Sequence, residues 1–250
     1  MAGVETGYFK PVQTGADSDC GTVEALTQIS HAEIEEPTYS FPEPMAPYLA
    51  AKRYGRTISL PHIDQRWSEL SRRAWIVEGA GGLLVPLNAK ETIRDLISML
   101  NLPLVLVAST RLGTINHTLL SLETAAKAGL RVLGVVLVGP HDANLKPLFE
   151  QFAGASVVAE IPWLSDVSPN ALGTAAGEYF PRPKLAQLFP ELFPWPSMRR
   201  RSCGATARPF GTLTPSMVCI PFVRRRSLPL GRISSSAMGP RSWMRFHRGG

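Results

Sequence analysis

Three continuous apolar runs constrain the fold of this chain more than any other feature of its sequence. Ala74–Val77, Leu104–Ala108 and Val132–Val138 are built almost entirely from aliphatic and aromatic residues, without polar alternation. Runs of this kind form strands that are buried on both faces of a sheet. The segments between them, Thr92–Leu100 and Asn116–Ala128, read as helices. The sequence therefore predicts an α/β domain with a doubly wound, mainly parallel sheet and helices on both faces.

The first part of the chain adds three weaker predictions. Gly7–Val12 reads as a strand that runs into a loop, and Ala16–Ser30 as a helix with acidic residues at its start. Ala46–Tyr54 reads as a helix in which Pro47 stands early, where its missing N–H does little harm.

The character of the sequence changes near residue 190. Residues 1–190 make up the predicted α/β domain, whereas residues 191–250 are rich in arginine, serine, proline and glycine and have no sustained periodicity. We expect this tail to be disordered. Its composition also fits out-of-frame translation of GC-rich DNA, a hypothesis that resequencing the source locus tests.

Charge and cysteine content exclude several classes of protein. The net charge of +6 comes from the tail, since no acidic residue follows Glu191. The body is mildly acidic, which argues against specific nucleic-acid binding. No apolar run reaches the roughly 20 residues that a membrane-spanning helix needs. We expect no signal peptide, because the first residues lack the charged and then apolar pattern of one. The cysteines, Cys20, Cys203 and Cys219, lack metal-ligand spacing and favour a reducing, cytoplasmic setting.

Charged residues follow two of the predicted strands. Lys10 stands where the first strand leaves the sheet, and Glu78 directly follows the strand Ala74–Val77. Ligands of doubly wound sheets bind beyond the carboxyl ends of the strands, so both side chains are candidates for one cleft. The glycines in Gly79–Gly82 allow main-chain amides to approach an anion. A surface lysine and a glutamate bonded to its own loop are the structural alternatives.

Two other stretches have a chemical and a structural interpretation. The carboxylates of Asp17–Asp19 suit Mg²⁺, which prefers one or two carboxylates plus phosphate oxygens, but they also suit helix caps. In residues 109–123 a strand ends, a glycine turn follows and a helix begins, and the free amides of that helix favour an anion. His117, on its first turn, is more often structural than catalytic in such a position.

Taken together, these stretches resemble the ATP-dependent dethiobiotin synthetases, a family of biotin-biosynthesis enzymes with a P-loop NTPase-like fold. The Lys-Pro-Val, Glu-Gly-Ala-Gly-Gly and Leu-Gly-x-Ile-Asn-His elements are the most specific part of the likeness. The matching stretches occur in the family's order over about residues 3–165: GYFKPVQTG (7–15), SD (18–19), PMAPYLAA (44–51), VEGAGGLLVPL (77–87), LVLVASTRLGTINHTLLSLE (104–123), GVVLVG (134–139) and EIPWL (160–164).

The resemblance implies an ATP- and Mg²⁺-dependent ring closure. One amine of 7,8-diaminononanoate takes up CO₂ to give a carbamate, and the carbamate attacks the γ-phosphate of ATP. The mixed anhydride then closes on the second amine to give dethiobiotin, ADP and phosphate. Positioning and charge stabilisation dominate phosphoryl transfers of this kind.

The resemblance also implies roles for individual residues. Lys10 neutralises charge on the carbamate and phosphate, and Asp19 and Glu78 hold Mg²⁺. The turn at Leu112–Asn116 binds the distal carboxylate of the substrate across a homodimer interface, and Pro162 lies near adenine. The implied contacts are, for substrate, Thr14, Gly79, Ala80, Gly81, Leu112, Gly113 and Asn116, and for nucleotide, Glu78, Gly81, Pro162, Trp163 and Leu164.

The sequence departs from the family's pattern in two places. The family places a strand and a P-loop ahead of the Lys-Pro-Val strand, and no G-x-x-x-x-G-K-[ST] match occurs in this chain. We therefore expect an N-terminally truncated domain with a gap in its sheet and impaired activity. Val138 stands where many members carry an asparagine that reads adenine.

Three other interpretations remain open from the sequence. In the first, the chain is a non-catalytic remnant or an interaction protein whose basic tail binds acidic partners. In the second, it is another P-loop amidoligase, such as a cobyric-acid-type synthase, although no glutaminase context surrounds Cys203 or Cys219. In the third, residues 199–250 are the scrambled start of a fused diaminononanoate aminotransferase.

Overall fold

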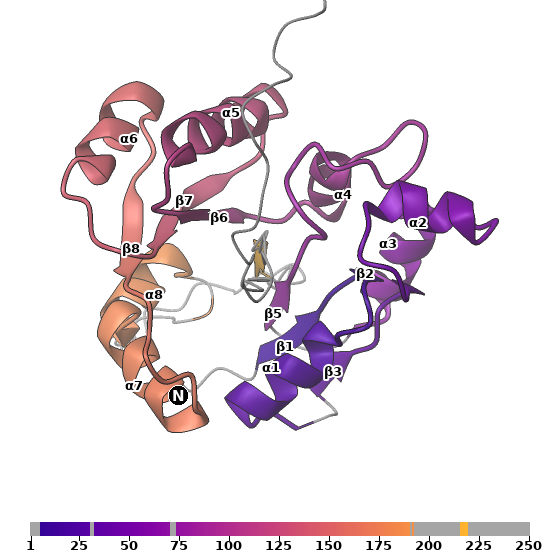
Figure 1. Ribbon diagram of the computed structural model, residues 1–250, viewed down its shortest axis with the longest axis horizontal. Coiled ribbons are helices and arrows are strands. Elements are labelled where there is room, and N and C mark those ends of the chain that lie inside the picture. The colour runs from indigo at the N-terminus through magenta and orange to yellow at the C-terminus, as the bar shows by residue number, and fades with distance from the viewer. Residues whose placement is uncertain (1–5, 31–32, 71–73, 191, 193–215, 220–250) are drawn as a thin grey trace, which may run out of the picture.

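A seven-stranded parallel sheet forms the centre of the computed structural model (Figure 1). The structure describes residues 6–30, 33–70, 74–190, 192 and 216–219. In sheet order the strands are β3 (Ile34–Glu35), β1 (Thr6–Phe9), β5 (Ala74–Val77), β9 (Ser216–Cys219), β6 (Leu104–Ser109), β7 (Val132–Val138) and β8 (Val157–Ile161). The predicted doubly wound α/β fold is confirmed.

Helices cover both faces of this sheet, with α4, α5 and α6 on one side and α1, α7 and α8 on the other (Figure 1). The helices are α1 (Asp19–Thr27), α2 (Pro47–Arg53), α3 (Leu60–Ser68), α4 (Ile93–Leu100), α5 (Thr114–Lys127), α6 (Leu145–Ala153), α7 (Pro169–Tyr179) and α8 (Arg182–Leu188). Two short strands, β2 (Val12–Thr14) and β4 (Tyr39–Phe41), form a separate parallel pair.

The strand pleat explains why the long apolar runs are needed. In β6, Leu106 packs with Phe149 of α6, whereas its neighbour Val105 packs with Phe189 just after α8. Successive side chains of a strand point to opposite faces, so a strand covered on both sides must be apolar at every position.

A close contact between β7 and β8 shows how tightly the sheet is packed. Gly134 has a φ of 154°, and a Cβ there would lie 2.4 Å from Val158 Cγ1 and 2.7 Å from the Ser156 carbonyl oxygen. No other residue fits this position without backbone movement.

The middle of the sheet differs from the prediction. Ser216–Cys219, from the tail that we expected to be disordered, form β9 between β5 and β6. All four residues pair with β5, but only Cys219 pairs with β6, opposite Leu104. The expected gap in the sheet is therefore filled, because the open ladders of β5 and β6 offer partners that composition does not reveal. The rest of the tail, apart from residue 192, lies outside the described residues.

Candidate active site

A lysine bridges two carboxylates at the carboxyl edge of the sheet. Lys10 Nζ lies 2.9 Å from Glu78 Oε1 and also donates to Asp19 Oδ2. The side chains of Lys10 and Glu78 are 9% and 16% exposed, so this ion pair is largely removed from water. The structure thus brings together residues that stand far apart in the sequence.

Parallel strand pairing produces this convergence. β1 and β5 are neighbours in register, with Phe9 opposite Val77, and Glu78 N–H donates to the Phe9 carbonyl oxygen at 2.9 Å. Both strands therefore end together, and the residue after each enters the same cleft.

The cap of helix α1 is Ser18, and not one of the two carboxylates within Asp17–Asp19 that the sequence offered for this role. Ser18 is the N-cap of α1, and its hydroxyl accepts from Gly21 N–H at 3.0 Å. Because Ser18 performs the capping, the Asp19 carboxylate on the first turn is available to meet Lys10. A carboxylate at this end of the helix is also favoured by the helix dipole.

The two carboxylates keep Lys10 charged. Burial alone lowers the pKa of a lysine, but the Glu78 and Asp19 carboxylates outweigh it here and the pKa of Lys10 is raised above 10.5. The site therefore holds a fixed ammonium at neutral pH, as an anionic substrate requires.

The carboxylates of Asp19 and Glu78 fit Mg²⁺ of the kind that completes its shell with phosphate and water. That ion is usually held by one or two carboxylates. No group of three or more His, Cys, Asp or Glu side chains that could hold a metal occurs in the described part of the chain. Two carboxylates leave the other coordination positions of such an ion to water or phosphate.

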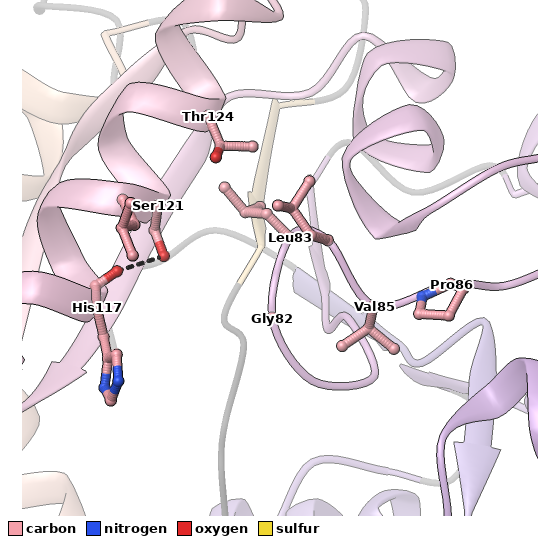
Figure 2. A pocket seen from close by; sticks show the side chains of 9 residues that line it. Gly82, Leu83, Val85, Pro86, His117, Ser121 and Thr124 are labelled. Atoms are coloured by element: carbon pink, nitrogen blue, oxygen red, sulfur yellow. Dashed lines mark hydrogen bonds between the residues drawn. The ribbon is translucent and has the colours of Figure 1, made fainter. Parts of the chain in front are cut away.

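The glycine loop after Glu78 forms one wall of a cavity of about 400 Å³. Figure 2 shows Gly82, Leu83, Val85 and Pro86 on one side, facing His117, Ser121 and Thr124 of α5 on the other. Gly81 has a φ of 88°, and a Cβ there would lie 2.9 Å from Val85 Cγ2.

This cavity is mostly apolar. Leu83, Leu84 and Leu120 line it together with aliphatic parts of the loop. A hydrocarbon chain suits such a surface better than a charged group does. The residues that follow the predicted substrate loop thus share this cavity with α5 from His117 onward, whereas Gly79–Gly81 and the Leu112–Asn116 turn do not line it.

The turn before α5 presents apolar side chains to solvent. Gly113 is the N-cap of α5 in the left-handed region, so the helix begins at Thr114, earlier than the sequence indicated. Leu112 is fully exposed and Ile115 is 41% exposed. Asn116 is also exposed. The first-turn amides of a helix have no partners within it, so this end is suited to a carboxylate.

The segment after β8 lies at a separate pocket of about 240 Å³ on the same edge of the sheet. This pocket is lined by Thr110, Gly139, His141, Glu160 and Pro162, among others. The Thr110 hydroxyl is buried and has no hydrogen-bond partner among the described residues.

Trp163 connects this pocket to the loop after β6. The Arg111 guanidinium lies over the Trp163 ring, 5.3 Å from its centroid. Pro162 and Trp163 are exposed and Leu164 is half-buried. Their position is compatible with a flat ring at the pocket mouth. Glu78, which was predicted to contact the nucleotide as well, lies across the sheet, directly after β5.

Sequence reasoning missed two buried polar residues, Tyr8 at the lysine site and Gln13 under the loop before α1. The Tyr8 hydroxyl donates to Glu78 Oε2 at 2.7 Å. Gln13 is buried, and its Nε2 donates to the Asp17 carbonyl oxygen at 2.9 Å, which holds the loop that follows Thr14. Alternation along the strand, which puts Tyr8 on the same side as Lys10, is the signal that could have found the first.

Comparison with known proteins places the fold in a class and then in a family. The family model described as AAA domain matches residues 1–171. The ATP-dependent dethiobiotin synthetase of Bacillus licheniformis is 37% identical over 182 residues, covering 68% of this chain and 77% of the relative. The enzyme of the same name from Lawsonia intracellularis is 36% identical, covering 66% and 79%.

A third relative is the bifunctional biotin-biosynthesis protein of Bordetella avium, which is 40% identical over 173 residues and of which 36% is covered. The fold is that of an AAA-class α/β domain. The chain belongs to the ATP-dependent dethiobiotin synthetase family.

Proposed function

We propose that this chain binds 7,8-diaminononanoate as its carbamate and serves the ATP-dependent closure of that carbamate to dethiobiotin in biotin biosynthesis. CO₂ and ATP are the co-substrates, and ADP and phosphate are the other products. The observation that carries the proposal is the Lys10 ammonium, buried between Glu78 and Asp19 at the carboxyl edge of the sheet. Family membership supplies the reaction.

Lys10 attracts the negative charge that forms on the carbamate and passes to the transferred phosphoryl group. A fixed ammonium in a site with little water stabilises developing anionic charge and needs no reorganisation during the reaction. Thr14, at the end of β2, supplies a hydroxyl near the same end of the substrate. The main chain of Gly79–Gly81 approaches the substrate and phosphates.

Asp19 and Glu78 are the residues that would hold Mg²⁺. When bound, that ion supplies positive charge to the phosphate oxygens. Pro162, Trp163 and Leu164 contribute a surface for adenine at the second pocket, where the Thr110 hydroxyl still lacks a partner among the described residues.

The nucleotide half of the site is where we expect the activity of this chain to be impaired. The sequence contains no G-x-x-x-x-G-K-[ST] element to cradle the phosphates with main-chain amides. We expect the 250-residue chain to bind the diamine and to turn over slowly or not at all.

Calorimetric titration of 7,8-diaminononanoate in bicarbonate buffer tests substrate binding. We expect saturable binding to the full chain. At a ligand concentration 100-fold above Kd, the bound diamine should raise the free energy of unfolding by about 2.7 kcal/mol. 8-Aminononanoate, which has the chain but only one of the two amines, serves as the matched control ligand and is expected to bind more weakly.

Absence of diamine binding at millimolar concentration would contradict the proposed function. Product formation is followed separately by mass spectrometry with ATP and Mg²⁺. Rapid dethiobiotin formation by the same protein would support the reaction and contradict the expected loss of activity.

We further propose that the working form is a homodimer in the cytoplasm. Leu84, Leu112 and Leu120 are each more than half exposed, and Leu84 and Leu120 line the apolar cavity beside α5. A second copy that covers this face would bury them and bring its Leu112–Asn116 turn to the distal carboxylate of the substrate. Within the described residues, no helix has the length and apolar character needed to span a bilayer.

Light scattering after size-exclusion chromatography tests the dimer. We expect twice the monomer mass for the wild type and the monomer mass for the double variant Leu112→Glu/Leu120→Glu, because two buried charges oppose association. Phe152→Glu, at a 67% exposed position on α6, is the matched control and should remain dimeric. A monomeric wild type at high micromolar concentration would refute this assembly.

A further inference from the structure

Tyr8 contacts the site through one hydrogen bond. Its hydroxyl donates to Glu78 Oε2 at 2.7 Å, while Lys10 Nζ donates to Oε1 of the same carboxylate at 2.9 Å. Both oxygens of Glu78 are therefore held by donors from one strand and the residue that follows it. A carboxylate fixed at both oxygens has a defined plane, which a single contact would not provide.

The surroundings of Tyr8 make this hydroxyl a fixed donor. The residue is 4% exposed, and its ring packs in a small cluster with Cys20 and Ile34. Burial, followed by the negative charge of Glu78, raises the pKa of Tyr8 well above its usual range. The packing of the ring and the hydrogen bond to Glu78 together hold the hydroxyl in place.

The packing of the ring alone does not account for this arrangement. A phenylalanine would fill the same cluster, but it would leave a half-buried carboxylate oxygen without its donor. An unsatisfied charged acceptor is costly, so the carboxylate would rotate to find another partner. The position of Oε1 relative to Lys10 and Asp19 would change as a result.

We propose that Tyr8 is a positioning residue that orients the Glu78 carboxylate for a divalent cation held by Glu78 and Asp19. This inference rests on the proposed function, in which those two carboxylates hold the metal. Tyr8 acts only through Glu78 and does not itself touch the cation. Loss of a residue that orients a metal-ligating carboxylate commonly lowers the affinity for the metal substantially.

The test is Mn²⁺ binding to the full chain, followed by the electron paramagnetic resonance signal of free Mn²⁺. Tyr8→Phe is expected to raise the Kd for Mn²⁺ about 10-fold. Tyr39→Phe is the matched control, because it also removes a buried hydroxyl, one that contacts Ser59 and His62 instead of the site. Its Kd should equal that of the wild type.

A double-mutant cycle with Glu78→Asp provides a second measurement. If Tyr8 acts through Glu78, the combined Tyr8→Phe/Glu78→Asp variant raises the Kd less than the product of the two separate effects. Circular dichroism verifies the fold of each variant. If Tyr8→Phe is unstable, Tyr8→Met, which also removes the hydroxyl, takes its place in both measurements.

The outcomes separate the two proposals. Equal Mn²⁺ affinity of wild type and Tyr8→Phe, or strictly multiplicative effects in the cycle, would overturn the role of Tyr8 and leave the proposed function intact. Failure of the wild type itself to bind Mn²⁺ would instead remove the metal role of Asp19 and Glu78, and the role of Tyr8 would fall with it.

Discussion

Lys10→Met is expected to destabilise the folded protein by about 3 kcal/mol, because removal of one partner from a largely buried ion pair leaves the other charges uncompensated. Lys10 is 7% exposed and contacts both Glu78 and Asp19, which would then face each other without a cation. Methionine keeps the length and most of the volume of the side chain, so the effect reports on charge. Urea denaturation followed by circular dichroism measures it.

The size and origin of this effect have separate controls. Lys52→Met, at an exposed position on α2, should change the free energy of unfolding by less than about 0.5 kcal/mol. Adding Glu78→Gln to Lys10→Met should recover part of the loss, since it removes one of the opposed charges. An equal loss in the single and double variants would contradict the electrostatic explanation.

The same ion pair predicts a dependence of stability on alkaline pH. The pKa of Lys10 is raised in the folded state, so its contribution is fully present below the unfolded value of 10.5 and is lost as pH rises through the folded pKa. The stability gap between wild type and Lys10→Met should be constant from neutral pH to about pH 9 and should narrow above about pH 10.5.

Proline substitution in β9 is expected to have the second large effect. Consecutive residues of a strand point their N–H groups in opposite directions, so one of the two variants Met217→Pro and Val218→Pro removes an N–H group that faces β5. Both residues pair with β5, in the interior of the sheet. A lost ladder bond and an unsatisfied buried carbonyl should cost about 3 kcal/mol in at least one variant.

Alanine at the same two positions is the matched control, because it retains the N–H group and should cost no more than about 1 kcal/mol. Chemical denaturation of the four variants provides the comparison. If both proline variants are as stable as their alanine counterparts, β9 does not contribute to the sheet in solution.

Long apolar runs made the core of the fold predictable. β5, β6 and β7 were each identified from sequence, because strands buried on both faces leave no polar residue to confuse the pattern. The short strands β3 and β4, with two and three residues, carry too little periodicity to be recognised. β9 could not be predicted, since its arginine-rich surroundings suggest disorder and only its pairing with β5 places it.

The site was partly predictable for a related reason. Parallel strands that end at one edge bring the residues that follow them together, which is how Lys10 and Glu78 could be associated from their positions alone. The partner that was missed, Tyr8, lies within an apolar run and reads as core, since nothing in a single sequence shows which way its hydroxyl points. The role of Asp19 depended on whether Ser18 capped α1, which only the structure decides.

The position of β9 sets the order in which this chain completes its sheet during synthesis. Residues 216–219 are the last described element to emerge from the ribosome, yet they pair with β5, whose residues emerged far earlier. Until then the nascent chain exposes two open ladder edges in its hydrophobic centre, and such edges are sites of wrong pairing between chains. Slow translation of the segment before β9 should therefore increase the demand for chaperones.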